Sequence, residues 1–298
     1  MWKLLAVFLL LAMVPWLGSA YLLGTLTVAC YFAVFAMSWD LLFGFANEVN
    51  FGPTFLIGAG AYTAGMLNWA GISIAGSLFG GVAAAEVCGL ALAVPALRLT
   101  GPYFGLVTLA SVLLLQQAVI IFAPFTGGEI GLTVRDVFSA DPETNYWISL
   151  GVCVLTGVVL LLLSRSSVGL ILQASSQDRL AAAALGFNVA KHKIAAFSIS
   201  ALFSGLAGAM LVFYMGAASI GTVIDISIGV QIIISAVLGG RRTIFGAALG
   251  TLALILAGEA LRPVGEIRTF LVSGAALVAI LFFPDGLVGQ ASRLWRTR

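Results

Sequence analysis

The stretch YLLGTLTVACYFAVFAMSWDLLF, residues 21–43, decides the fold. It is almost entirely apolar, and its one charged residue, Asp40, lies close to its end. A helix needs about 20 such residues to cross the ~30 Å hydrocarbon core of a bilayer. We therefore predict a membrane-spanning helix over 21–43, with Asp40 at the interface between the membrane and water.

Similar apolar runs recur along all 298 residues. The chain is 61% hydrophobic and 9% charged, which excludes a soluble globular domain because such domains carry about 25% charged residues. The regular alternation typical of β-barrel strands is not visible. We predict one all-α domain over 1–298, a polytopic membrane bundle of about ten transmembrane helices. These are expected near 4–18, 21–43, 51–70, 72–97, 102–122, 146–163, 194–216, 226–240, 244–257 and 268–283, although 44–60 also fits a re-entrant segment.

Basic residues predict the orientation of the bundle. If the N-terminus lies inside, the outer loops hold only Arg135, Arg262 and Arg268, and the inner loops hold the other eleven of the 14 basic residues. Because inner loops are enriched in Lys and Arg, both termini are predicted to be cytoplasmic. An alternative is that residues 1–20 form a cleaved signal peptide, since Lys3, an apolar run and Gly18-Ser19-Ala20 fit its three regions.

A mixed-charge stretch, residues 164–193, separates two of the predicted spans. Ser175 with Asp178 three residues later is typical of a helix start, and Gly186 is a stop signal. Leu180, Ala184 and Phe187 share one helical face. We predict a short amphipathic cytoplasmic helix that docks a soluble partner. The candidate docking residues are Ser175, Asp178, Arg179, Leu180, Ala184, Leu185, Gly186 and Phe187.

Two polar features interrupt the apolar spans. The stretch NEVNFGPT, residues 47–54, lies between two spans, and irregular backbone at membrane depth occurs where it is buried in protein or lines a cavity. A surface loop would explain it equally well. Glu86 lies inside an apolar helix, where a carboxylate costs at least ~2.5 kcal/mol, so it serves either packing or a solute pathway. The candidate pathway residues are Asn47, Glu48, Asn50, Gly52, Thr54 and Glu86.

Motifs for catalysis are missing from the sequence. The three lysines follow Trp2, Ala190 and His192, whereas a Walker A loop needs glycine before its lysine. No G-x-S-x-G, H-E-x-x-H or Rossmann pattern occurs, and the three cysteines stand far apart. We therefore expect no enzyme activity, no catalytic or metal site and no cofactor bound by this chain. The formal charge of +2 gives no reason to expect a nucleic-acid partner.

Six segments, in order along the chain, match the pattern of one known protein family. Residues 47–62, NEVNFGPTFLIGAGAY, match the family pattern at Gly52, Gly60, Ala61 and Tyr62. The other similar segments are LRLTGPYFGLVTLA (97–110), TGGEIGL (126–132), the stretch 166–188, VLGG (237–240) and FPDGLVG (283–289). Together these segments resemble the LivM-type permeases of branched-chain amino acid ABC importers. The chain departs from that family at Leu170 and Ser176, where basic residues are usual, and at Asn50-Phe51-Gly52-Pro53.

This resemblance implies a role in a larger assembly. The chain would be a permease subunit in the bacterial inner membrane, paired with a second, LivH-like permease. Two ABC ATPases, which carry the ATP and Mg²⁺, would dock on cytoplasmic loops such as 164–193, and a periplasmic binding protein would deliver amino acids or related small polar solutes. A self-sufficient secondary transporter or channel is the alternative, for which Glu86 would be the midplane group.

Overall fold

The computed structural model describes residues 11–16, 18–96 and 102–265, together with 267, 271, 273–275, 278 and 286. Most of the helix predicted at 268–283 and most of that at 4–18 lie outside the described residues, although residues 11–16 are helical. Helices dominate the described part. Its two short strands, β1 (Leu132–Thr133) and β2 (Ala217–Ala218), pair antiparallel with Leu132 opposite Ala218.

The helices follow the predicted apolar runs closely. A Ser19 hydroxyl caps the start of the first long helix, and proline stands at the beginning of three others, where its missing N–H leaves no helical bond unmade. The elements are α2 (Ala20–Asp40), η1 (Leu41–Phe45, a π-helical turn), α3 (Pro53–Trp69), α4 (Ile74–Ala96), α5 (Pro102–Ile121), α6 (Ala123–Thr126), α7 (Pro142–Arg165), α8 (Ser167–Gln177), α9 (Arg179–Ala184), α10 (Val189–Met215), α11 (Ile220–Val223), α12 (Ile226–Gly239), α13 (Ile244–Ala260) and η2 (Arg262–Val264, a 3₁₀ turn).

The predicted polytopic helix bundle is confirmed, but the count of about ten spans is not. Within the described ranges, six segments are long and apolar enough to cross a membrane: Ala20–Phe45, Ile74–Pro95, Pro102–Ile121, Pro142–Arg165, Val189–Met215 and Ile220–Gly239. The helices α3 and α13 have 17 residues each, about 25 Å at 1.5 Å per residue, and fall just short of this length.

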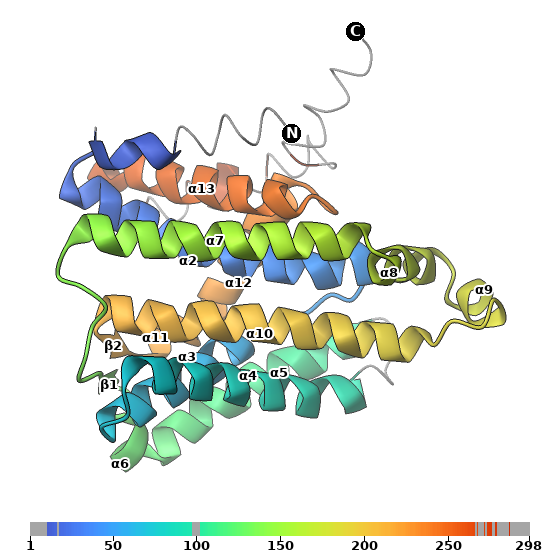
Figure 1. Ribbon diagram of the computed structural model, residues 1–298, viewed down its shortest axis with the longest axis horizontal. Helices are drawn as coiled ribbons and strands as arrows, with labels where there is room; N and C mark the ends of the chain where they lie inside the picture. Colours follow the sequence, from blue (N-terminus) through green and yellow to red (C-terminus); the bar gives the residue numbers. More distant parts are fainter. Residues whose placement is uncertain are drawn as a thin grey trace, which may run out of the picture.

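The long helices lie roughly parallel and antiparallel in one bundle (Figure 1). At one end α8 and α9 project beyond the other helices, and at the opposite end lie β1, β2 and α6. We call these the α8–α9 end and the β1–β2 end. The spans that contain α2 and α10 form the centre of the bundle. In their most apolar stretches of 18 residues, 61% and 78% of the residues are buried, against 28–33% in the other four spans.

Small residues let α3, α4 and α10 approach within backbone contact. A Cβ placed on Gly60 of α3 would lie 2.5 Å from the carbonyl oxygen of Gly205 in α10, and one on Gly81 of α4 would lie 2.6 Å from the carbonyl oxygen of Gly60. Such close approach stabilises helix pairs where lipid removes the hydrophobic driving force. The three helices therefore form one closely packed unit, which we call the α3–α4–α10 unit.

Candidate functional site

The amphipathic helix was predicted to start at Ser175, and this start is wrong. Ser175 lies inside α8, where it is buried and its hydroxyl donates to the carbonyl oxygen of Leu172 (2.9 Å). The chain breaks instead at Asp178, whose Oδ1 accepts the backbone N–H groups of Leu180 and Ala181, both at 2.9 Å. An aspartate caps a helix as well as a serine does, so the new helix, α9, begins three residues later than predicted.

The remaining predicted docking residues are all solvent-exposed at the α8–α9 end. Leu180, Leu185 and Phe187 are 82%, 76% and 42% exposed, and Asp178, Arg179, Ala184 and Gly186 are exposed beside them. Gly186 stops the helix as predicted, with a left-handed φ of +88°. Large apolar side chains gathered on an exposed surface are typical of a protein–protein contact. We call Leu180, Leu185 and Phe187 the apolar tip.

The segment 46–52 is a packed connection between two helices. The Trp39 indole N–H donates to the Asn50 carbonyl oxygen (2.6 Å), the Asn50 side chain accepts the Gly52 N–H (2.8 Å), and the Phe51 N–H donates to the Thr108 hydroxyl (3.0 Å). Asn50, Gly52 and Thr54 are buried, whereas Asn47 is exposed and Glu48 is half-buried. Of these candidate pathway residues, Asn47 is therefore open to solvent, Glu48 is partly open, and Asn50, Gly52 and Thr54 are closed off.

Asn47 and Glu48 are held by basic residues from distant parts of the chain. The guanidinium of Arg241, in the turn between α12 and α13, donates to the Asn47 amide oxygen. The Lys193 ammonium in α10 forms an ion pair with Glu48, and both side chains are mostly buried. These contacts place the segment at the α8–α9 end, against the α12–α13 turn and α10.

Glu86 lies apart from that segment and packs against α10. The Ser198 hydroxyl donates to Glu86 Oε1, and Oε2 is buried without a hydrogen-bond partner among the described residues. Ser198 is five residues beyond Lys193 on α10, about 7.5 Å further along the helix axis. The structure therefore brings Asn47, Glu48, Asn50, Gly52 and Thr54 together and places Glu86 elsewhere in the bundle.

A Glu86→Gln substitution should leave expression and solute uptake within about twofold of the unmodified chain. Glutamine keeps the shape of the side chain and one acceptor for the Ser198 hydroxyl, and it removes only the ionisable group. Uptake and its pH profile should be measured together, with Ser198→Ala as the matched control. A collapse of uptake with normal assembly would show that the charge serves the solute pathway.

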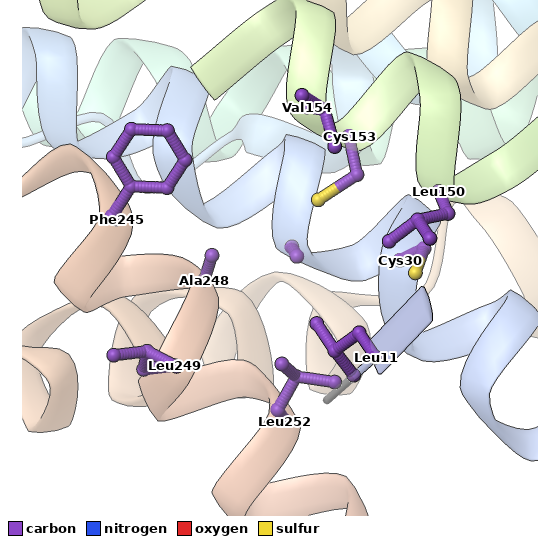
Figure 2. A pocket seen from close by; sticks show the side chains of 10 residues that line it. Leu11, Cys30, Leu150, Cys153, Val154, Phe245, Ala248, Leu249 and Leu252 are labelled. Atoms are coloured by element: carbon purple, nitrogen blue, oxygen red, sulfur yellow. The ribbon is translucent and has the colours of Figure 1, made fainter. Parts of the chain in front are cut away.

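An apolar pocket lies between α2, α7 and α13 (Figure 2). Its lining is made of hydrocarbon side chains and two thiols, so it offers no charged group to a polar solute. Its residues are Leu11, Cys30, Ala33, Leu150, Cys153, Val154, Phe245, Ala248, Leu249 and Leu252. This pocket is therefore a poor candidate for the solute site.

Sequence reasoning missed the role of Asp40. The structure buries this residue: Asp40 is 1% exposed, and its Oδ1 accepts the backbone N–H of Arg242 (3.1 Å). The two residues lie 202 positions apart, so no local pattern joins them. The available signal was a carboxylate at the end of an apolar span together with an Arg-Arg pair after Gly239-Gly240.

Comparison with known proteins shows the family to which this helix bundle belongs. The family described as branched-chain amino acid transport system, permease component, matches residues 21–281, which is most of the chain. The chain belongs to this family. It is therefore a permease subunit of an ABC importer, a transporter component rather than a catalytic enzyme, with homologues in the inner membrane.

Two curated relatives are similar to this chain over nearly its full length. The high-affinity branched-chain amino acid transport system permease protein LivM of Escherichia coli is 26% identical over an alignment of 324 residues, which covers 96% of this chain and 75% of the relative. LivM of Salmonella typhimurium is 26% identical over 310 residues, covering 92% and 71%. The similarity thus includes both the apolar tip and the segment 46–52.

Proposed function

We propose that the whole chain, 1–298, acts as one permease domain that pairs with a second, LivH-like permease to enclose a solute pathway. Two ABC ATPases supply the energy, and one of them docks on the apolar tip. ATP and Mg²⁺ bind to those partners and not to this chain. The observation that carries the proposal is the exposure of Leu180, Leu185 and Phe187 on elements that project beyond the end of the bundle, where the described part of the chain does not cover them.

The distribution of charge supports a cytoplasmic α8–α9 end. Arg165, Arg179, Lys191, Lys193, Arg241 and Arg242 belong to elements at this end, whereas Arg135 lies in the acidic connection that follows β1. Under the positive-inside rule both termini are then cytoplasmic, and a periplasmic binding protein meets the β1–β2 end. The named relatives carry branched-chain amino acids, so we propose these or related small polar solutes as the cargo.

The pathway residues stay a prediction. Asn47 is exposed and Glu48 is half-buried, and we place both at the cytoplasmic mouth of the route. Asn50 and Gly52 then shape the mouth through their contacts with Trp39 and Thr108, and the buried Thr54 follows them in α3.

Uptake should depend on ATP and not on an ion gradient. In proteoliposomes that hold this chain with its partner permease and both ATPases, and with binding protein outside, uptake of labelled leucine should stop when internal ATP is removed. It should continue when an ionophore collapses the proton gradient. Uptake that survives ATP removal while the proton gradient is held would instead show a secondary transporter. Liposomes without binding protein provide the control.

A further inference from the structure

The turn between α12 and α13 lies directly against the end of α2. Asp40, the last residue of α2, accepts the Arg242 backbone N–H, and this bond fixes one oxygen of a carboxylate that is 1% exposed. Gly44 fits closely between the two: a Cβ there would lie 2.5 Å from Asp40 Oδ1 and 2.8 Å from the Arg242 nitrogen. The backbone of the turn therefore lies in close contact with η1, and we expect a displacement of one to affect the other.

The side chain of Arg242 extends this contact to α8. Its Nε donates to the Gly44 carbonyl oxygen in η1 (2.8 Å), and its Nη2 donates to the Ser176 hydroxyl in α8 (3.0 Å). The residue has a left-handed φ of +62°, which is uncommon for a residue other than glycine and is maintained by surrounding contacts. A single residue thus contacts α2, η1 and α8.

The same turn also holds the beginning of the segment 46–52. Arg241 donates to the Phe43 carbonyl oxygen (3.4 Å) and to the Asn47 amide oxygen, and its guanidinium lies 4.7 Å from the centre of the Phe43 ring. From the other side, Lys193 of α10 pairs with Glu48. Residues 43–48 therefore lie between the α12–α13 turn and α10.

We propose that Arg242 is a positioning residue that transmits movement of α8 and α9 to η1 and the segment 46–52. The proposal rests on the proposed function, because an ATPase on the apolar tip supplies the movement. A displacement of α8 acts on the guanidinium through Ser176, and the guanidinium acts on the Gly44 carbonyl oxygen. A π-helical turn is a frequent feature of functional sites within helices, and η1 lies at the point where this displacement arrives.

Arginine suits this role because its planar guanidinium donates from Nε and Nη2 in two fixed directions at once. Lysine has a similar length and the same charge, but its single ammonium cannot hold both partners in this geometry. Arg242→Lys therefore keeps the charge of the turn and removes the bridge between η1 and α8. Ser176→Ala removes only the α8 end of the bridge.

Hydrogen exchange in the purified full-length permease tests the bridge without any partner. In Arg242→Lys and in Ser176→Ala, the amides of residues 41–48 should exchange severalfold faster than in the unmodified chain. Ser164→Ala is the matched control, since that hydroxyl bonds only to the Leu161 carbonyl oxygen in its own helix, and it should leave residues 41–48 unchanged. If the Ser176→Ala change stays confined to residues 167–187, the bridge does not transmit and the proposal is overturned.

The complete transporter tests the consequence for transport. Both variants should retain their ATPases and hydrolyse ATP within about twofold of normal. Solute moved per ATP should fall about tenfold in Arg242→Lys and less in Ser176→Ala, and the double variant should match Arg242→Lys because the contact is already lost. An unchanged ratio in Arg242→Lys, or losses that multiply in the double variant, would overturn the proposal.

A separate result would overturn the proposed function instead. If the unmodified chain fails to retain ATPases, the docking partner is wrong, and the exchange measurement still decides whether Arg242 joins α8 to η1. Arg262→Lys serves as the control in the transport measurement. Arg262 contacts Tyr21 and Glu259, which do not belong to α8, η1 or the α12–α13 turn. It should leave the ratio of solute to ATP unchanged.

Discussion

Replacing Leu180 and Phe187 together by aspartate should release the ATPase while the permease stays folded in the membrane. Both side chains are exposed in the free chain, so their loss opens no cavity. In a docked complex each would be a buried apolar anchor, and truncating such an anchor costs about 2 kcal/mol or more. Two of them give ~4 kcal/mol, or roughly 1000-fold in affinity. Co-purification of the ATPase and uptake coupled to ATP hydrolysis should both be lost.

The control for this double variant is Val137→Asp. Val137 is 49% exposed and belongs to the connection at the opposite end, so it introduces a charge on an apolar surface position without touching the apolar tip. It should retain the ATPase fully. Normal retention and normal coupled uptake in the Leu180→Asp/Phe187→Asp variant would show that the docking site lies elsewhere.

Gly52→Ala should strongly reduce the amount of folded permease. A Cβ at this position would lie 2.1 Å from the carbonyl oxygen of Thr108, and the obstructing atom belongs to the backbone of α5, which cannot rotate away. Overpacking costs typically ~1–3 kcal/mol, and a backbone-to-backbone clash places this substitution at the upper end or above it. The apparent melting temperature of the purified permease should fall, and uptake should fall with it.

Gly151→Ala is the matched control for that substitution. Gly151 lies within α7, and a Cβ added there would meet no described atom within 4 Å apart from its neighbours along the helix, so the methyl group is not obstructed. Alanine is favoured over glycine in a helix by up to ~1 kcal/mol, and the control should melt at the same temperature or higher. An unchanged melting temperature in Gly52→Ala would mean that α3 and α5 are not held as closely as described.

The spans were predictable because each depends on a property of a single stretch of sequence. An apolar run of about 20 residues has one stable solution in a bilayer, and α2, α5, α7 and α10 all coincide with predicted runs to within a few residues. The start of α9 was less predictable, since Ser175 and Asp178 are both good helix caps and lie three residues apart. Only the burial of Ser175 within α8 decides between them.

The polar contacts at the α8–α9 end were not predictable from local patterns. Asp40 meets Arg242, Glu48 meets Lys193 and Asn47 meets Arg241, over separations of 145 to 202 residues. Each of these residues also fits a solvated interfacial position when taken by itself. Which of them pair depends on how the helices stack, and that stacking follows from small residues whose partners lie on other helices.

The glycine contacts within the α3–α4–α10 unit also determine where the molecule can change shape. Gly60, Gly81 and Gly205 bring the backbones together with nothing larger than alanine methyl groups beside them, so these helices have no side-chain rotamers to rearrange. We therefore expect this unit to keep one arrangement during transport. Movement is expected in the elements at its border: η1, the α12–α13 turn and the pair α8 and α9. Spectroscopic labels placed within the unit would report a fixed frame, against which labels at the border would report each step of the transport cycle.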